Sequence, residues 1–207
     1  MKQNTEAYRN LFPVLVILSG PSGVGKDTVL TRMKQLKCLF HYVVTATTRP
    51  RRESEIADRE YHFLSREKFQ EMIRQDEFIE WANVYGYYYG VPKEEMRQAL
   101  REGKDIIVKV DVQGTETIKK KIPQAIAIFL KPPSMENLEQ RLRGRSSESS
   151  DNMNIRLKKA KDEIQKAAFF DYIVTNYQDE VDKVIAKIQN IVDSEKQKGR
   201  GNTKLVL

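Results

Sequence analysis

Short apolar runs alternate with segments of helical periodicity along most of the chain. The run at 11–18, LFPVLVIL, is rich in β-branched residues and too short for an independent helix. Such a run predicts a strand that is buried on both faces of a parallel sheet. Three further runs have the same character: 106–110, 125–130 and 172–175. Apolar residues recur at helical spacing in the segments 28–39 and 179–193. This alternation predicts an α/β fold with a parallel core sheet.

Two segments interrupt the alternation. From about 45 to 98 the chain has short polar and aromatic stretches with turn signals, which predict an inserted subdomain. A second insert at about 134–156 contains the polar stretch SSESSDN, which we expect to be mobile. We also expect a disordered tail at about 196–207. The remaining segments form the core of a single domain, at about 12–44, 99–133 and 157–193.

Composition narrows the class of protein. The chain has 207 residues, enough for one domain with a sizeable core, and its single cysteine excludes a disulfide framework. No apolar run comes near the ~20 residues that span a bilayer, so we expect a cytoplasmic protein without membrane contact. The formal net charge of +7 favours anionic partners but does not distinguish nucleotides from nucleic acids.

A glycine-rich segment, SGPSGVGKDT, directly follows the first predicted strand. Gly20, Gly25 and Lys26 match the pattern G-x-x-x-x-G-K between a strand and a helix. In this context backbone N–H groups and the helix N-terminus bind phosphate, and Lys26 would bridge the β- and γ-phosphates. The residues expected at this nucleoside triphosphate site are Gly20, Pro21, Ser22, Gly23, Val24, Gly25, Lys26, Asp27 and Thr28.

The residue after the lysine departs from this pattern. A serine or threonine hydroxyl usually holds Mg²⁺ there, but the chain has Asp27 followed by Thr28. Asp27 could bind the metal directly or through water, or Thr28 could contribute. Asp111 is a further candidate, so the metal ligands stay open.

A dense cationic cluster lies further along, with Arg49, Arg51 and Arg52 in four residues. Guanidinium groups suit phosphate because they donate two parallel hydrogen bonds. Alone, the cluster fits a solvated face and a nucleic-acid patch equally well. The segments EFIEW at 77–81 and YGYYYGVP at 85–92 favour a nucleotide instead. Tyrosine hydroxyls can donate to phosphate, and a carboxylate can accept from N1–H and the 2-amino group of guanine.

In combination these segments resemble the guanylate kinases, which pass the γ-phosphate of ATP to GMP. The resemblance covers about 14–192 and rests on GPSGVGK, TTRPRR followed by Tyr61, FIEW, YYG, DVQG, and PPS followed by RLRGR. It implies a P-loop three-layer fold with a parallel core sheet, a mixed α/β GMP-binding insert and a helical lid. It also implies ATP and GMP as small-molecule partners, Mg²⁺ as cofactor, no nucleic acid, and a monomer or homodimer.

The resemblance also assigns residues to the GMP site. Four of them would hold the GMP phosphate: Arg49, Arg52, Tyr61 and Tyr89. Thr45 and Glu80 would bind the guanine base. Asp111 ends the run IIVKVD at the carboxyl edge of the sheet, where ligands bind in open α/β sheets. It would orient an acceptor-site arginine or a metal-bound water, and the alternative is a helix N-cap.

The lid is expected to supply positive charge. Phosphoryl transfer needs charge stabilisation more than covalent chemistry, and the resemblance gives this role, together with Lys26, to Arg141, Arg145 and Arg156. The alternative is an exposed basic helix. The resemblance places Asn176 near the adenine of ATP, and a cap or turn role is the alternative for this residue.

Three residues depart from the family's pattern. Val91 replaces a hydroxyl near the base, Ser54 replaces a glycine, and Lys109 replaces an acidic residue. Lys109 could pair with Asp111 or Glu80, contact a phosphate, or weaken base recognition. Asp27, Val91 and Lys109 keep a ribose 1,5-bisphosphate phosphokinase as an alternative. A non-catalytic guanylate-kinase-like module that binds proteins and a nucleic-acid binder are further alternatives.

Overall fold

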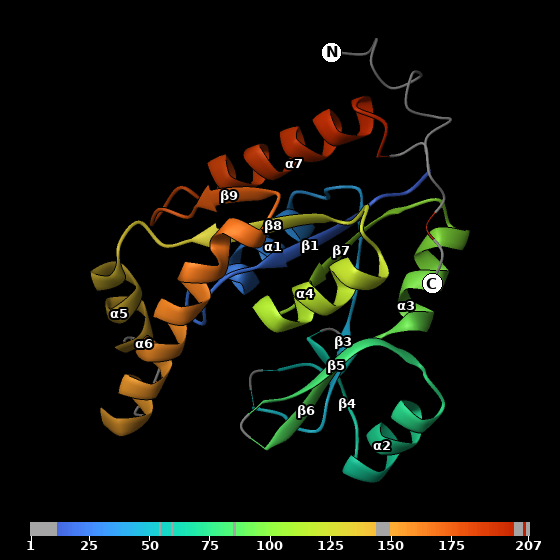
Figure 1. Cartoon of the computed structure of the whole chain (residues 1–207), viewed down its shortest axis with the longest axis horizontal. Coiled ribbons are helices and arrows are strands. Elements are labelled where there is room, and N and C mark those ends of the chain that lie inside the picture. Colours follow the sequence, from blue (N-terminus) through green and yellow to red (C-terminus); the bar gives the residue numbers. More distant parts are fainter. Residues whose placement is uncertain are drawn as a thin grey trace.

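The computed structural model describes residues 12–53, 55–58, 60–84, 86–143, 150–200 and 205, with the backbone alone for 150–154. A five-stranded parallel sheet forms the core and has the strand order β2-β7-β1-β8-β9 (Figure 1). Its strands are β1 (Leu15–Ser19), β2 (Phe40–Tyr42), β7 (Asp105–Lys109), β8 (Ile126–Lys131) and β9 (Tyr172–Thr175). The predicted α/β fold with a parallel core sheet is therefore confirmed.

Helices cover both faces of this sheet, which explains why its strands are apolar throughout. Val16 and Leu18 of β1 pack with α1 (Lys26–Gln35) and α7 (Val181–Gln197) on one face. Leu15 and Ile17 point to the other face, against α3 (Lys93–Arg101) and α4 (Val112–Lys121). All four β1 side chains are fully buried. The glycine-rich segment at 20–26, called the P-loop below, therefore starts from a fully buried strand.

The prediction missed strand β2. This strand has three residues, lies at the edge of the sheet and is only half-buried. Its sequence, FHY, has too few apolar residues for the buried-strand signal that identified its four neighbours.

A second sheet forms the predicted insert and has the strand order β4-β3-β6-β5. Its elements are β3 (Thr45–Thr47), β4 (Tyr61–Phe63), α2 (Arg66–Arg74), β5 (Phe78–Val84) and β6 (Tyr87–Pro92). Strand β3 pairs in parallel with β4 and antiparallel with β6, so the sheet is mixed. Phe69 of α2 stacks on Phe78 of β5 and on Tyr88 of β6, and these rings form a small core separate from that of the parallel sheet.

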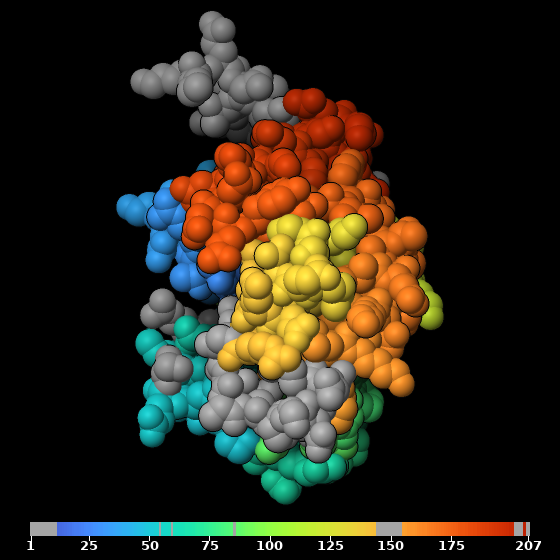
Figure 2. Space-filling view, turned by 90° about the vertical axis from the view of Figure 1, so that its left-hand side faces the viewer, coloured from blue at the N-terminus to red at the C-terminus, as the bar shows by residue number. Residues whose placement is uncertain are grey.

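The predicted lid contains α5 (Met135–Arg143) and the first part of α6 (Ser150–Gln165), which the 3₁₀ helix η1 (Lys166–Phe169) follows. Figure 2 shows α5 in yellow beside α6 in orange, below α7 in red. The expected mobile stretch SSESSDN covers 146–152, of which 146–149 lie outside the described residues. Residues 150–152 form the first turn of α6, and their mobility stays a prediction. Serine and aspartate are favourable at helix starts, so a polar stretch there does not exclude a helix.

The expected disordered tail is partly wrong. Helix α7 continues to Gln197, and Arg200 forms ion pairs with Asp171 and Glu195. Leu205 is buried in the apolar cluster on the α3–α4 face of the sheet. The tail therefore contributes to the core, whereas 201–204 and 206–207 lie outside the described residues. In the described part of the chain, no helix combines the length and the apolar character that crossing a membrane requires.

Candidate active site

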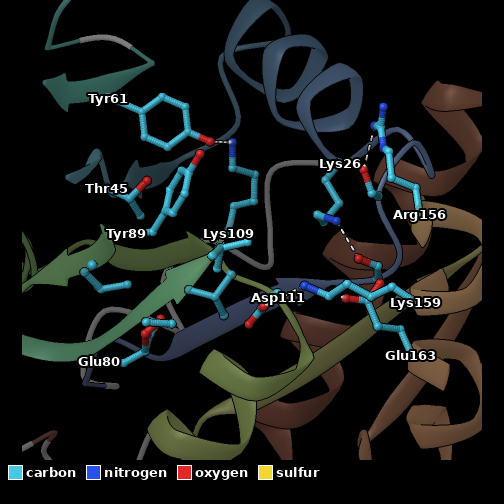
Figure 3. Close-up of a pocket in the computed structure, with 17 residues that line it drawn as sticks. Lys26, Thr45, Tyr61, Glu80, Tyr89, Lys109, Asp111, Arg156, Lys159 and Glu163 are labelled. Carbon is cyan, nitrogen blue, oxygen red and sulfur yellow. Dashed lines mark hydrogen bonds and ion pairs between the residues drawn. The ribbon is translucent and has the colours of Figure 1, made fainter. Parts of the chain in front are cut away.

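A cavity of about 280 Å³ lies where the P-loop, the carboxyl end of β7, the insert and α6 meet (Figure 3). A second cavity of about 500 Å³ lies between α1 and the insert. The two cavities have four lining residues in common: Thr45, Tyr61, Tyr89 and Lys109. The structure thus brings residues from distant parts of the chain to one edge of the core sheet, as the sequence predicts.

Glycines shape the P-loop between β1 and α1. Gly20, Gly23 and Gly25 have φ values of 142°, 83° and 102°, which side chains disfavour. A Cβ on Gly20 would also collide with the carbonyl oxygen of Leu130. Because α1 begins at Lys26, its N-terminal N–H groups lie next to the cavity, where an anion is stabilised.

Lys26 lies inside this loop and closes it. Its Nζ donates to the carbonyl oxygens of Gly20 at 2.5 Å and Pro21 at 3.1 Å. Burial lowers the pKa of Lys26 to about 8, although the charges of Glu163 and Asp27 oppose this shift. An incoming phosphate would supply the negative charge that favours the ammonium form.

Two residues expected at the nucleotide, Arg141 and Asn176, form hydrogen bonds with the backbone of the P-loop segment. Asn176 Nδ2 donates to the carbonyl oxygen of Val24 at 2.8 Å, and Arg141 donates to the same oxygen at 3.1 Å. Arg141 also donates to the carbonyl oxygen of Asn176 at 3.0 Å. Within the described residues, neither side chain lines the two cavities. The turn role considered for Asn176 agrees with these contacts.

The lid contributes one face of α6 to the smaller cavity. Arg156 donates to Ser22 Oγ at 2.9 Å, which brings the predicted lid arginine onto the P-loop (Figure 3). Lys159 and Glu163 line the same cavity, and prediction from the sequence missed both. Their spacing of three and seven residues from Arg156 places them on one helix face, which was the available signal. Arg145 lies outside the described residues.

Glu163 is a mostly buried acid beside two lysines, Lys159 and Lys26. Its side chain is 11% exposed. Burial raises its pKa, and the positive charges of Lys159 and Lys26 act in the opposite direction. The carboxylate therefore adds negative charge directly beside the P-loop lysine.

Glu80 lies at the opposite end of the smaller cavity, on β5. It is 6% exposed, and its Oε2 atom is buried without a hydrogen-bond partner. Burial raises the pKa of Glu80 to about 8, and the nearby charge of Asp111 adds to this effect. An unsatisfied buried carboxylate costs free energy, so this site favours a ligand that brings hydrogen-bond donors.

Asp111 takes the N-cap role that the sequence offered as an alternative, and it also faces the smaller cavity. Its Oδ1 accepts from the N–H of Gly114 at 2.9 Å, which confirms the N-cap of α4. Its Oδ2 lies 3.8 Å from Lys159 Nζ, and the residue lines the smaller cavity. The N-cap hydrogen bond fixes the Asp111 carboxylate in the smaller cavity, which Glu80 and α6 also line.

The expected phosphate-binding residues gather at the second cavity. Arg49, Arg52, Tyr61 and Tyr89 all line it, and the rings of the two tyrosines lie edge to face at 6.0 Å. Arg49 donates to Glu55 at 2.7 Å, and the N–H of Arg52 donates to the same carboxylate at 2.9 Å. Glu55 was missed from the sequence, where it is one acid among several after the arginines.

Lys109 pairs with a residue that the sequence did not suggest. Its Nζ donates to Asp27 Oδ1 at 2.6 Å and to the hydroxyl of Tyr61 at 3.3 Å, not to Asp111 or Glu80. A pair between Lys109 and Asp111 does not form, because β7 ends at Lys109 and Asp111 caps α4. The pair with Asp27 joins the end of β7 to the first turn of α1.

The other departures lie at different points of the site. Val91 is fully buried opposite Glu80 on the paired strand, so no hydroxyl reaches the cavity there. Ser54 lies outside the described residues, and Thr28 is exposed on α1. Among the residues described, no three histidine, cysteine or acidic side chains form a group that could hold a metal ion.

Comparisons with known proteins identify the family. Residues 13–195 match the family model described as guanylate kinase. A guanylate kinase from Caldanaerobacter subterraneus subsp. tengcongensis is 39% identical over 94% of this chain and 93% of its own length. The guanylate kinase 2, chloroplastic/mitochondrial, of Oryza sativa subsp. japonica is 39% identical over 90% of this chain and 66% of its own length. The crystal structure of guanylate kinase from Anaplasma phagocytophilum superposes with a TM-score of 0.76 at 29% identity, over 92% of this chain and 90% of that one.

Proposed function

The chain belongs to the guanylate kinase family, and we propose that it transfers the γ-phosphate of ATP to GMP, giving ADP and GDP. The observation that carries this proposal is Glu80, which lines the cavity that reaches the P-loop and has a buried Oε2 atom without a hydrogen-bond partner. Guanine offers N1–H and a 2-amino group on one edge, so it can satisfy this carboxylate. Adenine has an acceptor at N1 and offers only its 6-amino group as a donor, so it would satisfy the ionised carboxylate less well than guanine.

The acceptor phosphate would lie at the other end of the same cleft. Tyr61 and Tyr89 line both cavities, and Arg49 lies close to the Tyr61 ring, at 5.8 Å from its centre. Arginine and tyrosine donors suit a phosphate dianion. A nucleoside monophosphate with its base at Glu80 would therefore direct its phosphate toward the P-loop.

The donor triphosphate would occupy the P-loop. Its phosphates would accept from the N-terminal N–H groups of α1 and from Lys26, which would leave the carbonyl oxygens of Gly20 and Pro21. Arg156 already reaches Ser22 at the mouth of this loop. Charge from Lys26 and Arg156 would then stabilise the migrating phosphoryl group in an in-line transfer without a covalent enzyme intermediate.

Mg²⁺ fits this site as a partner of the nucleotide. Because Mg²⁺ keeps several waters and binds through one or two carboxylates and the substrate phosphates, it does not need a cage of protein ligands. Asp27 directly follows Lys26 and offers one carboxylate, and Asp111 could contribute through water. The ion would neutralise charge on the phosphates and orient them for transfer.

The test is ADP production from MgATP with separate acceptors: GMP, dGMP, AMP, UMP and ribose 1,5-bisphosphate. We expect turnover with GMP, alone or together with dGMP. Turnover only with ribose 1,5-bisphosphate would contradict the proposal and favour the small-molecule kinase alternative. ATP binding without turnover on any acceptor would favour a non-catalytic module.

A further inference from the structure

Two residues that depart from the family's pattern form an ion pair with each other. Asp27 replaces the usual hydroxyl after the P-loop lysine, and Lys109 replaces an acidic residue on β7. They lie 82 residues apart in the chain, yet Lys109 Nζ is 2.6 Å from Asp27 Oδ1. The two departures are therefore complementary in charge and in position.

The ammonium of Lys109 lies at the boundary between the two cavities and lines both. Three parts of the fold meet there. Lys109 ends β7, which pairs with β1 in the core sheet, Asp27 belongs to α1, and Tyr61 belongs to β4 of the insert. Figure 3 shows the Lys109 side chain directed at the hydroxyls of Tyr61 and Tyr89. The P-loop lies on one side of this ammonium and the expected acceptor phosphate on the other.

We propose that Lys109 binds the phosphate of the acceptor nucleotide, and that Asp27 is the positioning residue that aims its ammonium. This inference rests on the proposed function and names a cation that the family's pattern does not include. Its geometric basis is the contact with Tyr61, whose hydroxyl lies 3.3 Å from Lys109 Nζ and belongs to the expected phosphate site.

The hydrogen bonding of Lys109 leaves room for such a ligand. An ammonium group has three N–H donors, and in the described structure Lys109 donates to Asp27 and Tyr61. The third donor can reach a phosphate oxygen without loss of the other two contacts. The side chain is 18% exposed, so its hydrogen bond to a phosphate would be formed away from bulk water and would be stronger than one at the surface.

The position of Asp27 explains how the lysine is tolerated without ligand. A mostly buried ammonium needs a counter-charge, and Asp27 supplies it from a carboxylate that is itself 67% exposed. Lys26 lies near enough for the charge of Lys109 to oppose its protonation. The ammonium groups of Lys26 and Lys109 therefore lie on either side of the path between the donor and acceptor sites. Their positive charge suits a phosphoryl group, which carries several negative charges.

The experiment compares the affinity of GMP with that of guanosine by calorimetry in metal-free buffer, so that a metal role of Asp27 does not contribute. The Kd of guanosine divided by the Kd of GMP measures how much the phosphate contributes to binding. We expect Lys109→Met to reduce this ratio about 10- to 100-fold, as for the loss of one charge-assisted hydrogen bond, with guanosine affinity unchanged. Lys109→Arg should keep most of the ratio.

Two further variants separate positioning from general destabilisation. Asp27→Asn should reduce the ratio in the same direction, and its effect should largely disappear in a background that already carries Lys109→Met. Lys166→Met is the matched control, because Lys166 forms an exposed ion pair with Glu116 at 3.4 Å on the protein surface. This control should leave the ratio unchanged.

The outcomes are distinguishable from failure of the proposed function. Wild-type turnover of GMP combined with an unchanged ratio in Lys109→Met would overturn this inference alone. An equal loss of GMP and guanosine affinity in Lys109→Met, without rescue by Lys109→Arg, would show a structural role and also overturn it. A wild-type chain that neither binds nor phosphorylates GMP would overturn both proposals.

Discussion

Gly114 of α4 lies directly against Glu80 of β5, and a Cβ on this glycine would be 2.8 Å from Glu80 Oε1. The glycine therefore makes room for the carboxylate that we assign to the guanine base. Asp111, which caps the same helix, holds the N–H of Gly114 with its Oδ1. The space for the Glu80 carboxylate thus depends on the first turn of α4 and on the absence of a side chain at position 114.

Gly114→Ala should impair base recognition selectively. In an exposed helix interior this substitution stabilises by roughly 0.5–1 kcal/mol, but here the methyl group would displace the Glu80 carboxylate. We expect KM for GMP to rise about tenfold or more and KM for ATP to stay near the wild-type value, as measured by steady-state kinetics. Gln113→Ala, an exposed neighbour on α4, is the control. Equal KM values for GMP in both variants would contradict the proposed contact.

Glu80 should also make GMP binding dependent on pH. Its pKa is raised from 4.5 to about 8 by burial and by Asp111, so the free protein holds a proton there at neutral pH. Only the ionised carboxylate accepts both donors of guanine. GMP affinity should therefore increase as the pH rises from about 7 to 8.5, and binding should release a proton near pH 7. Calorimetry in two buffers of different ionisation enthalpy measures this release.

Glu80→Gln is the matched variant for this measurement. The amide has nearly the same shape, cannot ionise and offers one acceptor instead of two. We expect weaker GMP binding, reduced preference for GMP over AMP, and no proton release from this position. Preference for guanine at the wild-type level in Glu80→Gln would mean that another group binds the base.

Substitution of the two lid arginines, Arg141 and Arg156, should affect different properties of the protein. Arg141 braces the carbonyl oxygens of Val24 and Asn176, whereas Arg156 reaches Ser22 inside the cavity. Arg141→Met should lower stability by about 1–3 kcal/mol, because it removes charged hydrogen bonds to part-buried carbonyl groups, and it should raise KM for ATP. Arg156→Met should lower kcat with little change in stability. Denaturant unfolding and kinetics on both variants, with Arg143→Met as surface control, measure the difference.

Much of the fold could be predicted from local pattern because parallel core strands are buried on both faces. The strand at 172–175 was predicted with its observed bounds, as its apolar run ends in polar residues at both sides. Strand β2 could not be found in this way, since an edge position leaves it half-buried. Leu205 was assigned to a disordered tail because the final apolar stretch, LVL, is too short to carry a periodic signal.

The chemistry of the site was predicted from motifs, but its pairings were not. Glu80 and Lys26 were identified because they belong to short segments with a recognisable order. The contact between Lys109 and Asp27 depends on the register of β7 against β1, which no local pattern encodes. The helical spacing of Glu163 from Arg156 could have placed it on the cavity face of α6, but its burial next to Lys26 depends on tertiary packing.

His62 should make stability depend on pH through its contact with Glu95. Glu95 of α3 lies 3.1 Å from His41 of β2 and 3.1 Å from His62 of β4, so it links the core sheet to the insert. Its hydrogen bond raises the pKa of His62 above 6.5; burial opposes this shift, and Asp58 adds to it. A group whose pKa is higher in the folded than in the unfolded chain stabilises the fold fully below the unfolded value.

This stabilising contribution should therefore be present below pH about 6.5 and disappear as the pH rises through the higher pKa of folded His62. We expect the free energy of unfolding to decrease over that interval in the wild type, measured by urea denaturation at several pH values. His62→Gln should remove this part of the decrease. His41→Gln keeps the contacts of His62 with Glu95 and Asp58, so the decrease should persist in that control. A wild-type profile that matches that of His62→Gln across the interval would show that the Glu95 contact does not hold the proton on His62, and that the link between core and insert is insensitive to pH.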